Sequence, residues 1–98
     1  MKLFFPKDDP EEIVEDLVEA LGGRKLAKML QFDIKGSDIT ITVKKLGTSV
    51  MEFEHNEKDG GSEYTLRSEK IAMAHKPLKD EMMSKLFGVV ESVGGKVL

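Results

Sequence analysis

The stretch Lys28–Lys45, KMLQFDIKGSDITITVKK, constrains the fold of this chain more than any other segment. Apolar and polar residues alternate along both of its halves, so each half has one apolar and one polar face, as in a half-buried β-strand. Gly36 and Ser37 separate the halves, and glycine at the first central position suits a type II′ turn between paired strands. The stretch therefore predicts a β-hairpin.

Turn and alternation fix the register of this hairpin independently. A two-residue turn sets Lys35 opposite Asp38 and Ile34 opposite Ile39. A slip by one residue would turn the apolar side chains of one strand toward water. The apolar face that results consists of Leu30, Phe32, Ile34, Ile39, Ile41 and Val43.

Two further connections extend the hairpin into an antiparallel meander of four strands. The first is Leu46–Thr48, after which Met51 is expected opposite Val43 so that the apolar face stays continuous. The second is Asp59-Gly60, a dipeptide typical of type I′ turns, in which both central residues take positive φ. Residues 69–76 fit either a short fifth strand or a helical turn.

Helical periodicity flanks the meander on both sides. After Asp9-Pro10, a capping aspartate with proline at the first helical position, apolar residues recur at helical spacing up to Gly22-Gly23. A second stripe follows Pro77 and ends at Gly94-Gly95, and Gly88 within it is expected to mark a close approach to the sheet. Two helices packed on one face of an antiparallel sheet of four to five strands make an α+β domain that spans residues 1–98.

An internal similarity supports an alternative topology. Leu17–Leu26 and Val89–Leu98 share a Val-Glu pair, a glycine pair and a final leucine. Helices that end in glycine resemble one another for mechanical reasons alone. The alternative is a duplicated β-α-β element with extra strands at Lys2–Phe5 and Lys96–Leu98. That arrangement would be a ferredoxin-like β-α-β-β-α-β sandwich with an inserted hairpin.

Composition excludes several classes of function. The chain of 98 residues is 40% hydrophobic and 34% charged, as in folded soluble domains, and it has no cysteine for a disulfide, a thiolate zinc site or a thiol nucleophile. No apolar run approaches the ~20 residues of a membrane span. The apolar run that ends at Pro6 is too short for a signal peptide. We therefore expect a cytoplasmic protein without a membrane partner, and its many lysines and glutamates are typical of heat-adapted proteins.

Nucleic-acid and cofactor binding are not expected either. The net charge is −3, and the small basic cluster Lys44-Lys45 shares the polar sheet face with Glu52 and Glu54. Nucleic-acid binding calls for a basic face with aromatic residues. Glycine-rich phosphate loops and a nucleophile elbow are absent from the sequence.

Two sets of residues could carry chemistry. His55 and His75 are the only histidines, and Tyr64 is expected beside His55. If both histidines reach the same end of the sheet, the three side chains could bind an anion or small ligand, or relay protons. The alternative is two inert histidines at strand ends, because a pair without a third ligand rarely holds a metal.

The second set is the acidic loop with Glu57, Asp59 and Glu63, a weaker candidate for a cation site. Its spacing does not match the EF-hand pattern. Turn geometry alone also explains the Asp-Gly pair.

The leading hypothesis is a non-enzymatic module that binds a protein partner, with self-association through the open edges of its sheet. It rests on the missing catalytic constellations. Met29 and Val50, on an otherwise polar face, could add a small contact patch. A ligand-binding protein or minor enzyme that uses His55, Tyr64 and His75 is the alternative.

Overall fold

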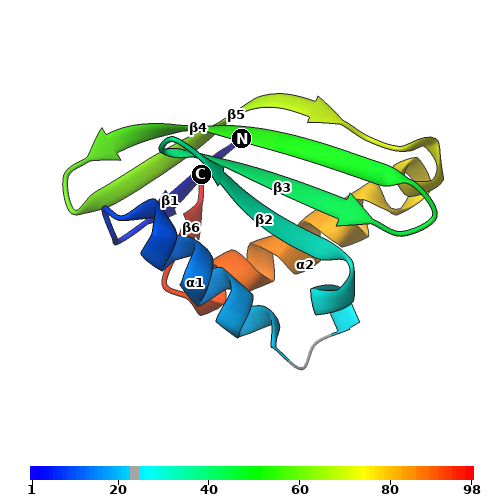
Figure 1. The fold of residues 1–98 in the computed structure, drawn as a ribbon, viewed down its shortest axis with the longest axis horizontal. Coiled ribbons are helices and arrows are strands. Elements are labelled where there is room, and N and C mark those ends of the chain that lie inside the picture. The colour runs from blue at the N-terminus through cyan, green and yellow to red at the C-terminus, as the bar shows by residue number, and fades with distance from the viewer. Residues whose placement is uncertain (23–24) are drawn as a thin grey trace.

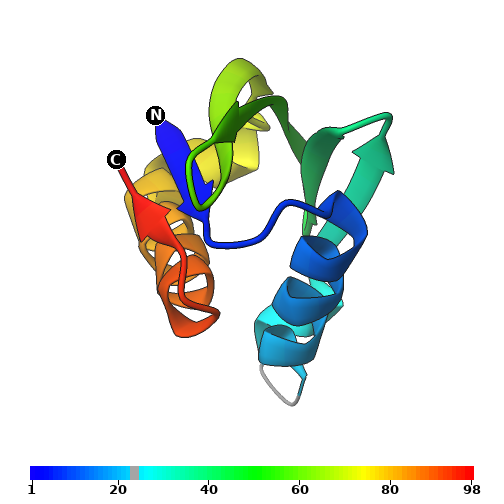
Figure 2. The same ribbon diagram turned by 90° about the vertical axis from the view of Figure 1, so that its left-hand side faces the viewer.

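The computed structural model describes residues 1–22 and 25–98. Within them, two helices cover one face of a six-stranded antiparallel sheet of order β2-β3-β4-β5-β1-β6 (Figures 1 and 2). The strands are β1 (Lys2–Phe5), β2 (Leu30–Lys35), β3 (Asp38–Lys44), β4 (Thr48–Lys58), β5 (Gly61–Lys70) and β6 (Lys96–Val97). The helices are α1 (Pro10–Leu21) and α2 (Lys79–Ser92), with short 3₁₀ segments η1 (Lys25–Lys28) and η2 (Met73–Leu78).

The α+β class is confirmed, with six strands instead of four or five. The open segment 69–76 is divided between the end of β5 and η2.

Both ends of the chain contribute strands. β1 lies between β5 and β6 and pairs antiparallel with each of them. β5, α2 and β6 therefore form a split β-α-β unit with β1 in the gap. The strand order corresponds to the ferredoxin-like alternative, in which an inserted hairpin lengthens the meander.

The β2–β3 hairpin has the predicted register along its whole length, from Leu30 opposite Val43 to Lys35 opposite Asp38. Gly36 has a φ of 63°, and Ser37 keeps a negative φ, as a type II′ turn requires.

The predicted β3–β4 register is wrong by two residues. Met51 lies opposite Ile41, and Ser49 takes the place opposite Val43. The connection is Lys45–Gly47, where Leu46 has a φ of 54° and lets the chain reverse one residue earlier than expected. Because a shift by two residues keeps every side chain on its face, the apolar face survives.

The β4–β5 pairing agrees with the prediction near the turn, where His55 lies opposite Tyr64. Only Gly60 of the turn has positive φ, so the type I′ assignment is wrong. A β-bulge beyond Phe53 then shifts the register, which places Ser68 opposite Glu52.

Gly94 and Gly95 end α2 as predicted, whereas Gly22 and Gly88 differ from their predictions. Gly94 has a φ of 85°, and the Gly95 N–H donates to the Val90 carbonyl (3.0 Å), which closes α2 with a Schellman motif. Gly22 has a φ of −50° and is not a left-handed cap, and Gly23 lies outside the described residues. Gly88 has open space where a Cβ would stand, so the close approach expected there is wrong.

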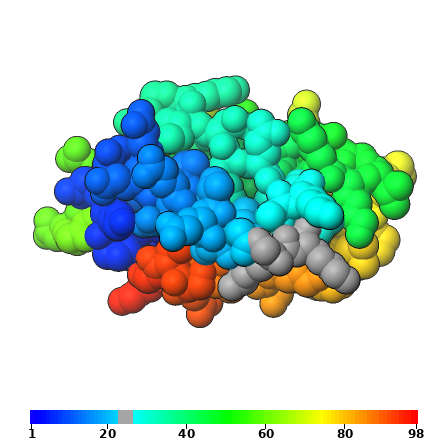
Figure 3. Space-filling model, turned by 60° about the horizontal axis from the view of Figure 1, so that its bottom comes forward, coloured from blue at the N-terminus to red at the C-terminus, as the bar shows by residue number. Residues whose placement is uncertain are grey.

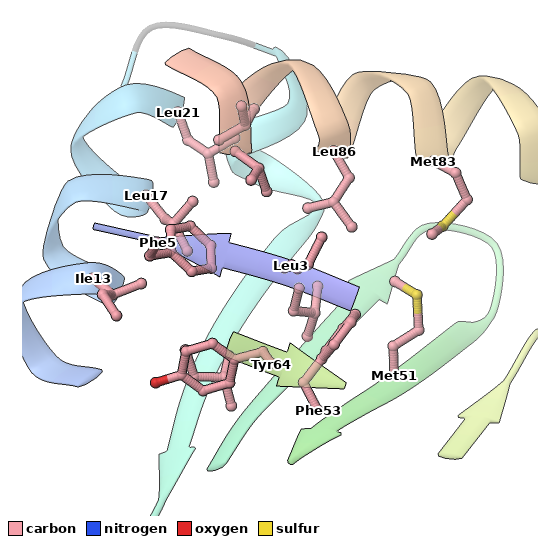
Figure 4. Close-up of a cluster of buried hydrophobic side chains, with 14 of the residues drawn as sticks. Leu3, Phe5, Ile13, Leu17, Leu21, Met51, Phe53, Tyr64, Met83 and Leu86 are labelled. Atoms are coloured by element: carbon pink, nitrogen blue, oxygen red, sulfur yellow. The ribbon is translucent and has the colours of Figure 1, made fainter. Parts of the chain in front are cut away.

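The core lies between the sheet and the two helices (Figure 4). α1 begins at its predicted cap, where the Asp9 carboxylate accepts the Glu11 N–H (3.0 Å). The helices bury Ile13, Leu17, Leu21, Met83, Leu86, Val89 and Val90. The sheet buries Leu3, Phe5, Ile39, Ile41, Val43, Met51, Phe53 and Tyr64. No helix in the described ranges is long and apolar enough to cross a membrane.

Candidate functional sites: two histidine clusters and a free sheet edge

His55 and Tyr64 stand side by side where β4 and β5 pair. Their rings meet edge to face, with centroids 5.3 Å apart. The buried Ser62 hydroxyl donates to the Lys7 carbonyl (2.8 Å), so it accepts the Nε2 hydrogen of His55 at 3.1 Å. The backbone N–H of His55 donates to Asp38 Oδ1 (2.9 Å). Both Nε2 and the backbone N–H of His55 thus have hydrogen-bond partners within the protein.

The Tyr64 hydroxyl differs, because it has no hydrogen-bond partner in the described part of the chain although the residue is buried. Burial raises the pKa of Tyr64 to about 12, and the negative charges of Asp38 and Asp9 contribute. The tyrosine ring also lines a small core cavity with residues such as Leu17 and Phe53, which offer no polar atom to a ligand.

His75 is buried and bonded through both ring nitrogens. Nε2 lies 2.5 Å from the Lys45 carbonyl, which can only accept, so this nitrogen carries the hydrogen. Nδ1 lies 2.5 Å from the hydroxyl of buried Ser49, which also accepts the Ala72 N–H (2.9 Å). His75 thus holds together three segments: the loop between β3 and β4, the start of β4 and the residues that lead into η2.

His75 lies beside the start of β4, whereas His55 belongs to the second half of that strand. Ser49, the partner of His75, is six residues from His55, which corresponds to about 20 Å along a strand. The structure therefore brings His55 and Tyr64 together and leaves His75 apart from them. No shared cluster of the three side chains forms.

The acidic loop residues do not converge either. Strand alternation places Glu57 on the face that the helices cover and Glu63 on the opposite face. Glu63 is paired with Lys2, with Oε1 3.6 Å from Nζ. Among the described residues, no group of three histidine or acidic side chains is arranged to hold a metal ion.

Sequence reasoning missed the serines that hold both histidines. Ser49 and Ser62 are buried on the helix-covered face, and alternation along β4 and β5 places them there once the register is known. The sequence carried no other sign of these bonds, because Ser49 binds His75, 26 positions away, and Ser62 binds the Lys7 carbonyl, 55 positions away, in addition to His55.

The free edge of β2 is the other candidate, since β2 pairs on one side only. The Lys44 N–H donates to the Met29 carbonyl (2.8 Å), which sets the phase of the β2–β3 ladder. In an antiparallel ladder, alternate residues point their N–H and C=O away from the neighbouring strand. The residues with this outward orientation in β2 are Leu30, Phe32 and Ile34. Their side chains face the helices but are only half-buried.

The opposite edge of the sheet, formed by β6, has fewer backbone groups for pairing with a further strand. β6 is two residues long. Natural sheets commonly protect an edge by keeping its strand short. Of the two edges, β2 is therefore the one with room for a further strand.

Comparisons with protein-family models, with curated proteins and with solved structures found no match. The functional inference therefore rests on the geometry of the chain itself.

Proposed function

We propose that this protein is a non-enzymatic interaction module that forms a homodimer by pairing β2 with β2 of a second copy. The observation that carries the proposal is the free edge of β2, where Phe32 and Ile34 have unpaired backbone groups and half-buried apolar side chains. A strand added at this edge satisfies the backbone groups and covers the apolar side chains at once.

A two-fold axis at Phe32 gives the most favourable register. It sets Leu30 opposite Ile34 of the second copy, so all three outward-facing residues are paired. It also sets Gln31 opposite Asp33 of the second copy, on the polar face. The Gln31 amide already donates to the Asp33 carboxylate within one chain (3.0 Å), so the two groups are chemically matched.

Neighbouring registers are poorer. An axis at Asp33 would set two carboxylates directly opposite each other, which is destabilising in a sheet. An axis at Gln31 would set Ile34 opposite Lys28 of the second copy, outside the strand. The interface is short in every case, so we expect a dissociation constant on the order of micromolar.

Cysteine cross-linking tests the dimer and its register together. The chain has no cysteine, so a single introduced cysteine is the only thiol that can form a disulfide between two copies. In Phe32→Cys the two thiols meet at the axis, where opposed Cα atoms are about 5.5 Å apart and within reach of a disulfide. Ile34→Cys is the matched control, because it lies opposite Leu30 instead of its own counterpart.

We expect mild oxidation to link two copies of Phe32→Cys through a disulfide and to leave Ile34→Cys without a covalent cross-link. Sedimentation of the unmodified chain provides the independent measurement. A monomer at every concentration up to millimolar would refute self-association, and equal cross-linking of both variants would refute the register.

A further inference from the structure

A hollow at one end of the molecule, here called the Leu46 hollow, is lined by apolar side chains from separate segments. It is a shallow depression, and the empty space in it, including the part that is open solvent, is about 350 Å³. Figure 3 shows the β3–β4 connection and η2 beside each other at this end. The apolar lining consists of Met29, Val43, Leu46, Ala74, Leu78 and Met82. Met29 therefore belongs to this helix-side surface and not to the polar sheet face where the sequence placed it.

Leu46 is in a conformation that leucine disfavours. Its φ of 54° is the only positive φ of a non-glycine residue in the described chain. Glycine or asparagine would hold this turn with less strain. Its side chain is also 87% exposed, so packing in the core does not compensate for the strain. A strained backbone that presents an apolar side chain to water indicates a functional contact.

Other exposed apolar side chains surround the hollow. Leu78, part of its lining, is 50% exposed, and Met73 in the same 3₁₀ segment is 83% exposed. Methionine adapts its shape readily to different apolar partners. Large apolar side chains gathered at one end of a protein are typical of a binding surface.

The rim of this surface carries lysines. Lys45 lines the hollow, and Lys76 lies in the same 3₁₀ segment as Leu78. Both are exposed, and neither pairs with a carboxylate of the described chain. In a chain with a net charge of −3, this apolar depression thus has unpaired positive charge beside it.

We propose that the Leu46 hollow binds an acidic segment of another protein that carries large apolar side chains. An apolar side chain would enter the hollow while neighbouring carboxylates meet the lysines of the rim, as in the binding of an amphipathic helix to a groove. This goes beyond the dimer proposed above, because Leu46 and the lysine rim are not part of the β2 edge.

An anionic membrane surface fits the same end less well. The hollow is concave and suits a single inserted side chain better than a flat bilayer.

Fluorescence anisotropy with a designed peptide tests the proposal. The probe is a capped, labelled peptide with leucine at positions i, i+3, i+4 and i+7 and glutamate at most others. We expect the complete chain to bind it, and Leu46→Glu to weaken binding about tenfold or more, since it removes an apolar contact and adds a like charge. Val18→Glu is the matched control, because Val18 is 54% exposed on α1, away from the hollow.

Two further measurements separate binding from folding and from dimerisation. Leu46→Gly should raise the melting temperature and still weaken peptide binding, because it relieves the strain but removes the side chain. The edge variant Ile34→Pro should bind the peptide as the unmodified chain does. Raising the salt concentration from about 0.05 to about 0.5 M should weaken binding through screening of the lysines.

Unchanged peptide binding by Leu46→Glu would overturn the proposal, as would an equal loss in Val18→Glu. Leu46-dependent binding to phosphatidylserine vesicles without peptide binding would assign the surface to membranes and overturn it as well.

Discussion

His75 joins three segments of the chain through the two nitrogens of one ring. One ring nitrogen is hydrogen-bonded to the Lys45 carbonyl and the other to the Ser49 hydroxyl. The same hydroxyl accepts the Ala72 N–H. A buried ring with every polar atom bonded stabilises the fold and leaves no atom for a substrate. The position of His75 therefore has a structural reason that does not depend on catalysis.

Replacing His75 with alanine should lower the free energy of unfolding by about 2–4 kcal/mol. The variant leaves the Ser49 hydroxyl without its acceptor and the Lys45 carbonyl without its donor, and it opens a cavity. Urea denaturation measures the change. Lys76→Ala, an exposed neighbour, is the control and should stay within about 0.5 kcal/mol of the unmodified chain. Similar values for both variants would show that the His75 bonds contribute no stability.

Tyr64→Phe should preserve or raise stability, by up to about 1–2 kcal/mol, because it removes a buried hydroxyl that has no partner among the described residues. Chemical denaturation of both proteins under the same conditions gives the difference. A clear loss of stability in the phenylalanine variant would reveal a partner of the hydroxyl.

The same residue should make stability depend on alkaline pH. The pKa of Tyr64 is raised from its usual 10.0 to about 12, mainly by burial, so folding favours the protonated hydroxyl. This contribution is complete below pH 10 and is lost as the pH rises toward 12. Absorbance titration should show a tyrosine ionising near the upper value. Tyr64→Phe should lack this part of the alkaline decline, and an ionisation near 10 would contradict the burial of the hydroxyl.

At the scale of elements, the end of α2 and the strand β1 meet at Gly95. A Cβ there would lie 2.7 Å from Val90 Cγ1 and 3.0 Å from the Phe4 carbonyl oxygen. Gly88, in the middle of the same helix, has open space at the equivalent point. Gly88 within α2 and Gly95 just after it therefore have opposite structural requirements.

Alanine substitutions at these glycines should change stability in opposite directions. Gly88→Ala should stabilise the protein by about 0.5–1 kcal/mol, because alanine is the better helix former. Gly95→Ala should destabilise it by about 2 kcal/mol or more, because the contact with backbone atoms cannot relax easily. Thermal unfolding of both variants provides the measurement. A stabilising effect at Gly95 would show that the helix and β1 are not in close contact.

The elements that the sequence predicted correctly are those with local causes. In the β2–β3 hairpin, Gly36 and the alternation on both arms act within a few residues and lead to the same register. The β3–β4 register depends on the unusual conformation of Leu46, which no propensity indicates. The pairing of β1 with β5 depends on contacts between distant parts of the chain, so the sequence could offer it only as an alternative.

The candidate sites follow the same rule. The contact of His55 with Tyr64 came from a local turn and was predictable from the sequence. The position of His75 depends on η2, a short segment without a clear periodic pattern, and its partner Ser49 is 26 residues away. The Leu46 hollow is likewise assembled from separate segments: the sequence placed Leu46 in a connection and Met29 on the polar face, and did not bring them together.

At the scale of the whole molecule, the proposed dimer couples association to stability. Ligands that bind only the folded state raise its stability by mass action, and a second copy acts as such a ligand. The melting temperature should therefore rise by a few degrees for each tenfold increase in concentration. Ile34→Pro removes an N–H that points away from β3, so it should abolish this dependence and leave the β2–β3 ladder in place. A melting temperature independent of concentration in the unmodified chain would contradict the dimer.

The position of β1 between β5 and β6 has a consequence for the order of folding during synthesis. Lys2–Phe5 leave the ribosome early, but their partners, Gly61–Lys70 and Lys96–Val97, come from the last part of this chain. The strands β2 to β5 are each paired with the next in sequence, and such local pairings form faster than distant ones. Leu3 and Phe5 therefore stay in an unpaired segment while the meander forms. β1 is therefore made before the other five strands of the sheet and is among the last to pair.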